Sequence, residues 1–192
     1  MSDEPAIALL EFNSVAVGTH AADAMVKKAP IQTFRVGTVQ PGKYLVLIGG
    51  SVAAVEESYA EGRRVGGEAL TDEVLLPNVH GQVYDAVGGK RQTKSADDAV
   101  GIIESSGLSA TLAAADKAVK TADVTITEIR LGDGLGGKGI THLTGTVEAV
   151  QAAVEAALAV ITRPGVSVRH TIIPAVDDEL RQRIHASTEF QP

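Results

Sequence analysis

The 192-residue chain contains no cysteine, which excludes disulfides, thiol nucleophiles, Cys-ligated zinc and Cys-ligated iron–sulfur clusters. It has only 3 Phe, 3 Tyr and no Trp, so large aromatic stacking platforms are not expected. No apolar run approaches the roughly 18 residues of a transmembrane helix, and the first five residues do not resemble a signal peptide. We therefore expect a soluble, cytoplasmic protein without a membrane partner.

Charge and composition narrow the choice of partners further. The net charge is -7 and no basic run is present, so nucleic acid and anionic membranes are poor candidates. A composition of 44% hydrophobic and 21% charged residues is typical of a globular chain rather than a disordered one.

The chain repeats itself in order. The matched segments are 6–11 with 99–104 and 22–29 with 115–122, both 93 residues apart; then 42–43 with 137–138, 95 apart; and 76–77 with 173–174, 97 apart. Offsets that grow by small steps indicate loop insertions in a duplicated domain. We therefore predict a first domain at 1–90, a linker at 91–98 and a second domain at 99–192, each of about 90 residues.

Apolar periodicity and turn residues predict the same elements in both copies. In the first copy we expect strands at 7–12, 31–39, 44–48 and 69–76, and helices at 14–28 and 51–64. In the second we expect strands at 99–104, 124–131, 140–143 and 167–173, helices at 108–120 and 147–160, and a short tail helix at 177–186. The order β-α-β-β-α-β, twice, predicts an α+β fold of two tandem ferredoxin-like domains. This fold hosts many functions and does not by itself identify one.

Two helices carry an Asp and a Lys four residues apart. These pairs are Asp23 with Lys27 and Asp116 with Lys120. Because residues at this spacing are neighbours on a helix surface, we expect both pairs on exposed faces.

The glycine-rich segment 132–139 is the most prominent local motif. It satisfies G-x-G-x-x-G and nearly satisfies a P-loop, but Gly139 replaces the Ser or Thr that a P-loop needs. Phosphate binding also needs a long helix after the loop, and the following segment 140–145 is too short to supply one. A flexible hairpin turn is the favoured interpretation, and a nucleotide-binding enzyme remains an alternative.

No catalytic or metal-binding set stands out, so we expect neither enzymatic activity nor a cofactor. The five histidines are scattered and form no H-x-x-x-H pair; they are His20, His80, His142, His170 and His185. Glu11 and Glu104 occupy matched strand ends and could act as acid and base, although a structural role is favoured. Ser14, Ser105 and Ser106 lack the context of a nucleophile.

Three of these features occur twice and in the same order. They are the helix segment A-D-x-x-V-K-x-A, the turn Gly-Lys followed by a strand that runs to a Gly, and an apolar strand that ends in Pro. Together they resemble the bacterial microcompartment (BMC) shell-protein domain, and the duplication resembles its tandem-domain, trimer-forming type, close to the single-layer trimers of propanediol-utilisation shells. The resemblance covers residues 5–88 and 97–190.

The resemblance implies a non-enzymatic shell protein in the bacterial cytoplasm. Three chains would form a flat pseudohexameric disc with a central pore for small metabolites, tiling with hexameric and pentameric shell proteins. A ring built from a heterologous interface is a common route to such a disc. The alternative from another class is a ferredoxin-like trimeric regulator or sensor of small molecules. Functional asymmetry is expected where the two copies differ.

The family pattern also implies site residues. The pore-lining turns would be Gln40, Pro41, Gly42 and Lys43, and Asp133, Gly134, Leu135, Gly136, Gly137 and Lys138. Lys27, Lys120 and His80 would lie at the edges where discs meet. Some tandem relatives bind an iron–sulfur cluster through a pore-loop Cys, but Gln40 occupies that position here. The arginine that helps join discs in relatives is also absent, from residues 77–80 and 174–177.

Overall fold

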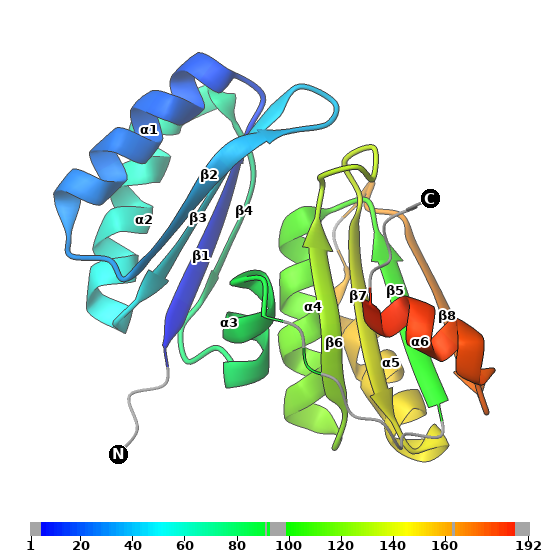
Figure 1. Cartoon of the computed structure of the whole chain (residues 1–192). Coiled ribbons are helices and arrows are strands. Elements are labelled where there is room, and N and C mark those ends of the chain that lie inside the picture. The colour runs from blue at the N-terminus through cyan, green and yellow to red at the C-terminus, as the bar shows by residue number, and fades with distance from the viewer. Residues whose placement is uncertain (1–4, 91, 93–98, 163, 187–192) are drawn as a thin grey trace.

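The computed structural model describes residues 5–90, 92, 99–162 and 164–186, which form two α+β domains in tandem (Figure 1). The first contains β1 (Ala6–Phe12), α1 (Val15–Lys28), β2 (Thr33–Val39), β3 (Lys43–Gly50), α2 (Val52–Gly66), a 3-10 turn η1 (Gly67–Ala69), β4 (Leu70–Leu76) and α3 (Gly81–Val87). The second contains β5 (Ala99–Ser105), α4 (Leu108–Thr121), β6 (Thr125–Leu131), β7 (Gly139–Gly145), α5 (Val147–Val160), β8 (Val168–Pro174) and α6 (Asp178–Ala186). The predicted β-α-β-β-α-β order is confirmed in both copies.

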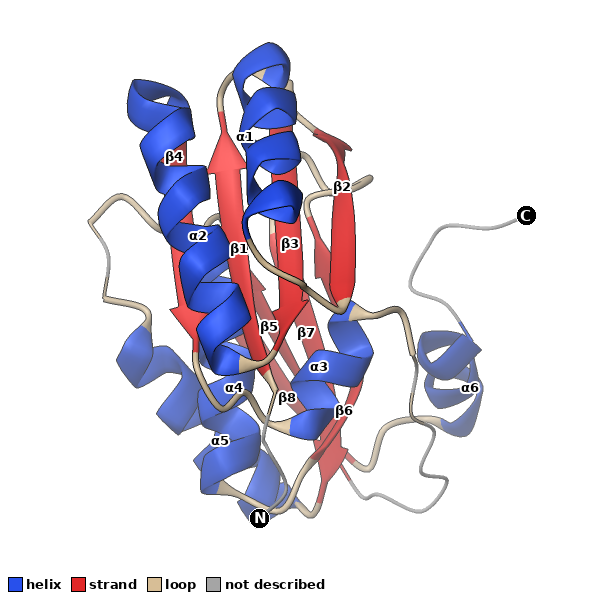
Figure 2. Cartoon of the chain, turned by 90° about the vertical axis from the view of Figure 1, so that its left-hand side faces the viewer, coloured by secondary structure: helices blue, strands red, loops and turns tan. Residues whose placement is uncertain are grey.

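Each domain is an antiparallel four-stranded sheet with two helices on one face. The strand orders are β2-β3-β1-β4 and β6-β7-β5-β8, so the duplication extends to the topology. Figure 2 shows α1 and α2 side by side over the first sheet. The register repeats as well, because Ala6 pairs with Gly50 and Ala99 with Gly145. We call the sheet face opposite the helix pair the outer face.

Hydroxyl side chains cap three of the long helices. The Ser14 and Ser51 hydroxyl oxygens accept hydrogen bonds from backbone N–H groups at the starts of α1 and α2, at 3.3 and 3.4 Å. Thr146 does the same for α5 at 3.2 Å. These caps satisfy donors that the first helical turn leaves without a partner, which explains where the three helices begin.

The first sheet buries apolar side chains on both faces. Leu10 and Phe12 point toward α1 and α2, in a cluster that includes Met25. Ile7 and Leu9 alternate with them and lie on the outer face, in the cluster that forms the core of the second domain. Because β1 is buried at all seven positions, its sequence is a continuous apolar run that only Glu11 interrupts.

The second domain covers the outer face of the first. Helix α4 packs against β4, and α3 lies between the domains and packs against β6 (Figure 1). The Gln82 amide bridges this contact, donating to Val124 O at 3.1 Å and accepting from Ile126 N at 2.8 Å. A carboxylate oxygen of Asp72 accepts hydrogen bonds from the backbone and side chain of Ser109, at the start of α4. One apolar cluster therefore extends across both domains, and a second lies between the first sheet and its own helices.

One helix was not predicted from the sequence, and most of the predicted linker cannot be compared with the structure. Helix α3 was not predicted, because seven residues between His80 and Gly88 are too few for helical periodicity to be recognised. The predicted linker 91–98 lies, apart from Gln92, outside the described residues. None of the helices within the described ranges combines the length and apolar character needed to cross a membrane.

Gly101 tests the packing of the second domain. A Cβ at Gly101 would lie 2.7 Å from Leu143 Cδ1 and 2.8 Å from Val150 Cγ1. We expect Gly101→Val to lower the free energy of unfolding by about 1–3 kcal/mol, because the extra atoms overpack this core. Gly37→Val is the matched control, since a Cβ at that strand glycine meets nothing within 4 Å. Urea unfolding measures both, and equal stability of the two variants would contradict the packing described.

Candidate functional site

The two predicted pore-lining turns lie against each other. One joins β2 to β3 and the other joins β6 to β7, at the same end of the two sheets (Figure 1). A Cβ at Gly137 would lie 2.9 Å from Gln40 O and 3.1 Å from Pro41 Cδ. A Cβ at Gly132 would lie 3.1 Å from Val39 Cβ. The structure thus brings together two segments that are about 90 residues apart in the sequence.

Glycine in the second turn is required by both conformation and space. Gly132, Gly134, Gly136 and Gly137 all have positive φ, from 61° to 86°. Side chains rarely adopt this conformation, and at Gly137 the first turn also occupies the space of a Cβ. The residue after the turn begins strand β7 rather than a helix. The helix N-terminus on which phosphate binding depends is therefore missing, and the hairpin-turn prediction is confirmed.

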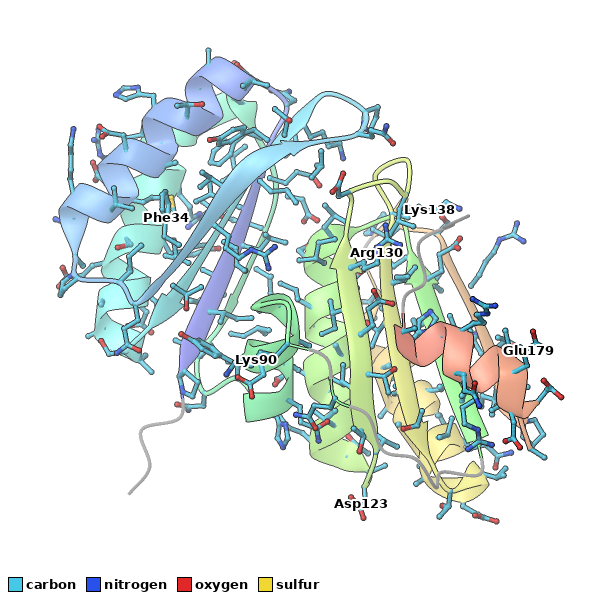
Figure 3. The ribbon with its side chains drawn as sticks, viewed as in Figure 1. Phe34, Lys90, Asp123, Arg130, Lys138 and Glu179 are labelled. Atoms are coloured by element: carbon cyan, nitrogen blue, oxygen red, sulfur yellow. The ribbon has the colours of Figure 1, made fainter. Side chains whose placement is uncertain are left out.

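The lysine that follows each turn points back over the outer face of its own sheet. Lys43 Nζ lies 2.6 Å from Glu11 Oε1. Lys138, which is labelled in Figure 3, has its Nζ 2.9 Å from Glu104 Oε1. Glu11 is 4% exposed and also accepts a hydrogen bond from the Thr71 hydroxyl at 3.2 Å. Both glutamates thus neutralise a lysine at the base of a turn. This arrangement favours their structural interpretation over the acid–base alternative.

With both lysines paired, Asp133 is the charged residue at the tip of the turns. It is exposed, and its backbone oxygen accepts a hydrogen bond from Arg130 Nη2 at 3.0 Å. Gln40, on the first turn, is exposed as well. Leu135 is half-buried, and the exposed residues of the paired turns are Gln40, Pro41, Gly42, Asp133, Gly134, Gly136 and Lys138.

Two predicted edge residues, Lys120 and His80, meet at the junction of the domains. Lys120 Nζ donates to Asn78 O at 2.8 Å and to Asp116 Oδ2 at 2.7 Å. Asp116 Oδ1 accepts from the backbone N–H of His80 at 2.8 Å. The expectation that Asp116 is exposed was wrong: it is only 8% exposed, because the first domain covers this part of α4.

Lys27, the third predicted edge residue, lies elsewhere. On α1 its Nζ pairs with Asp23 at 2.6 Å, and both side chains are more than half exposed, as predicted. The same Asp–Lys motif is therefore a surface pair in the first copy and an interdomain contact in the second.

The sequence analysis missed the junction itself. One signal was available: the helix in the second copy has Leu108, Leu112 and Val119 where the first has Val15, Thr19 and Val26. Leu112 in place of Thr19 makes the outward stripe of the second helix more apolar. Within the described ranges, no group of three or more His, Asp or Glu residues could hold a metal ion.

Comparison with known proteins gives a consistent result. The family model described as "BMC domain" matches twice, at residues 6–79 and 99–176. The bacterial microcompartment shell protein PduT of Citrobacter freundii is 37% identical over 169 residues, covering 88% of this chain and 91% of that protein. A solved microcompartment protein from Desulfitobacterium hafniense has 40% identity and a TM-score of 0.85, covering 93% of this chain and 99% of that one.

A more distant structure supports the fold alone. A fused permuted hexameric shell protein from the RMM microcompartment has a TM-score of 0.58 at 20% identity, over 81% of this chain and 83% of that one. The resemblance inferred from the repeated motifs is confirmed by the family match and the two closer relatives.

The two Lys–Glu pairs differ in burial and can be compared directly. We expect Lys43→Met to lower the free energy of unfolding by about 3 kcal/mol, because it leaves the buried Glu11 carboxylate without its cation. Lys138→Met should cost less than about 1 kcal/mol, since the Glu104 side chain is 36% exposed. Chemical denaturation measures both.

The double variant Lys43→Met/Glu11→Gln should regain most of the lost stability, because no buried charge remains. If Lys43→Met and Lys138→Met had the same free energy of unfolding, the deeper burial of Glu11 would not make its pair the more stabilising one.

Proposed function

Because the chain belongs to the BMC domain family and carries that domain twice, we propose that it is a structural tile of a bacterial microcompartment shell. The proposed tile is a homotrimer in which six domains surround a central pore for small metabolites. The observation that carries this proposal is a difference in exposure between equivalent residues of the two copies. The helix α4 and edge strand β6 that are covered at the domain junction have uncovered equivalents in α1 and β2, and the covered α3 has one in α6.

The first such pair of surfaces is α1 and α4. Leu108 and Val119 on α4 are 0% and 8% exposed, because they pack on the first domain. Their equivalents on α1, 93 residues earlier, are Val15 and Val26, which are 43% and 38% exposed.

The sheet edges beside these helices repeat the difference. Ile126 and Ile129 on β6 are 1% and 8% exposed. On β2, Phe34 and Val36 hold the same places in the strand pairing and are each 42% exposed. Helix α1 and strand β2 thus form one apolar surface, the free α1–β2 surface (Val15, Val26, Phe34, Val36). Exposed large apolar residues gathered on one face are typical of an interface.

The chain also has a free counterpart for this surface. Val83 on α3 is fully buried at the junction, whereas Leu180, at the equivalent place on α6, is 46% exposed. The outer face and α6 of one second domain can therefore cover the free α1–β2 surface of the next chain, as the outer face and α3 of the first domain cover α4 and β6. A contact of this head-to-tail kind, repeated, closes into a ring.

Polar groups at the junction have equivalents in the proposed contact. Asn78 and Ala175 hold matched places after the last strand of each domain, and both have positive φ, 60° and 49°. Lys120 donates to Asn78 O within the chain. By the same geometry, Lys27 would donate to Ala175 O of the next chain.

In such a ring the paired turns would surround the axis. Six turns, alternating between the two kinds, would line the opening with glycine backbone and with Gln40, Pro41, Asp133 and Leu135. Lys43 and Lys138 would contribute little charge there, because each is bound by a glutamate. Passage of small polar metabolites needs only suitable width, polarity and charge, so the proposed role requires no catalytic residue.

The tile would be joined to hexameric and pentameric shell proteins at its rim. Lys27, Lys120 and His80 keep their proposed role at these edges, where the contacts between domains would reach the rim; in the single chain the two lysine side chains are 72% and 38% exposed. Of the two alternatives, the nucleotide-binding enzyme is disfavoured by the strand that follows the glycine-rich turn. No contact in the described part of the chain favours the regulator over the tile.

A charge at Val26 tests the ring. We expect the unmodified chain to sediment as a trimer and Val26→Asp to sediment as a single chain, because the carboxylate would be buried against the next copy without a partner. Val160→Asp is the matched control: Val160 is also 38% exposed but lies on α5, outside the free α1–β2 surface. It should remain trimeric in sedimentation velocity at micromolar concentration.

Two results would contradict the proposed ring. One is an unmodified chain that sediments as a monomer at this concentration, and the other is dissociation by both substitutions alike.

A further inference from the structure

A cavity of about 420 Å³ lies where the two domains meet, below the paired turns. Strand β2 of the first domain and β6 of the second form its walls, and the end of α3 closes one side. Its volume falls within the range of small-molecule sites, about 300–1,000 Å³. All of its lining residues belong to one chain, so the cavity forms whether or not the chains assemble into a ring.

The floor of the cavity is apolar and its walls are charged. Leu9, Leu45 and Leu47 form the floor, from the outer face of the first sheet. The lining residues of the walls include three bases, Arg35, Lys90 and Arg130, and two acids, Glu128 and Asp133. An apolar floor beside a guanidinium suits a ligand with a short hydrocarbon part and one negative charge.

Arg35 is the cation beside the leucine floor, since it lines the cavity from β2 and pairs across the strands with Leu47. One of its guanidinium nitrogens donates to Val87 O, a neutral acceptor that fixes the side chain without cancelling its charge. Within the described ranges Arg35 forms no ion pair. Lys90, at the end of α3 in Figure 3, is already paired with Asp85 at 2.9 Å, and this hydrogen bond raises the pKa of Lys90. Arg130, labelled on β6 in Figure 3, donates to Asp133 O.

The cavity depends on positions where the two copies differ. Arg35 pairs across the strands with Leu47, and the equivalent pair in the second domain is Glu128 with His142. A register irregularity between Ile126 and Glu128 places that acid at the position of the arginine. The second copy therefore cannot repeat the basic wall, and the site occurs once per chain.

We propose that this cavity binds a short-chain monocarboxylate. The guanidinium of Arg35 presents paired N–H donors that match a carboxylate, and the leucine floor receives the hydrocarbon chain. The two acidic lining residues disfavour a dianion, which separates this ligand class from phosphate esters.

Butyrate is a suitable probe, because it combines one carboxylate with a short apolar chain. Titration of the full-length protein, followed by calorimetry and ligand-observed NMR, should show saturable binding with one site per chain. Butyramide, the neutral analogue of equal length, and inorganic phosphate should each bind at least about tenfold more weakly, a difference of about 1.4 kcal/mol.

Two substitutions remove the site in different ways. Arg35→Gln removes the cation, and Gly37→Leu fills the cavity from a strand position where a Cβ meets no neighbour within 4 Å. Each should weaken butyrate binding at least about tenfold while circular dichroism and sedimentation stay unchanged. Arg64→Gln and Gly81→Ala are the matched controls, because Arg64 pairs with Glu61 on α2 and a Cβ at Gly81 meets open space.

The results separate this inference from the proposed ring. Equal binding of butyrate and butyramide, tighter binding of phosphate, or unchanged butyrate binding by Arg35→Gln would each overturn the inference. If Gly37→Leu failed to fold, the Arg35→Gln result would decide alone. A trimer that does not bind butyrate would overturn the inference and leave the shell proposal standing. A monomer that binds butyrate would support the inference and contradict the proposed ring.

Discussion

The fold depends on one constraint: the first sheet carries apolar side chains on two faces, but its own helices cover only one. In the first domain, Leu10 and Phe12 face the helices while Ile7 and Leu9 face away, and all four are buried. Each such side chain contributes about 1.5–3 kcal/mol when it leaves water. A domain of about 90 residues has little stability to spare, so a single copy could not leave this face exposed. The neighbouring domain is therefore part of the fold.

Within one chain, the second domain covers the outer face of the first sheet. The outer face of the second sheet, which would meet the next chain in the proposed ring, has a different composition. On the outer face of the second sheet, His142 stands where the first sheet has Leu47, and Glu128 stands where it has Arg35. The contact inside the chain is thus the more apolar one, with Asp72 bound at the start of α4. Because the two domains are covalently linked, the two surfaces of this contact are also held at a high effective concentration. The proposed contact between chains is more polar, and it has to form from separate molecules.

Most of the fold could be predicted from local patterns, because the spacing of apolar residues indicates each helix and strand and Gly and Pro mark where it ends. The repeat provides a second copy in which each predicted element can be checked. The pairing of Gly42 with Gly137 in the repeat also anticipated that the two turns are equivalent. What could not be predicted depends on contacts between domains. Asp116 is buried because another domain lies over it, and the direction of Lys43 is set by Glu11, 32 residues away in the chain. The difference between Arg35 and Glu128 at equivalent places in the two copies follows a register irregularity before Glu128 that no periodicity reveals.

The position of the turns follows from the same contact that buries the outer face. Because α4 packs on β4 and α3 on β6, the ends of β2 and β6 come together at Val39 and Gly132, and their two turns meet. Their backbones approach so closely that Gly137 could not carry a side chain without displacing Gln40 O, 2.9 Å from the place of its Cβ. The glycines of the second turn are thus a consequence of domain packing as well as of turn conformation. In the proposed ring, the width of the pore would be set by this packing, and its chemistry by the few side chains that the packing leaves exposed.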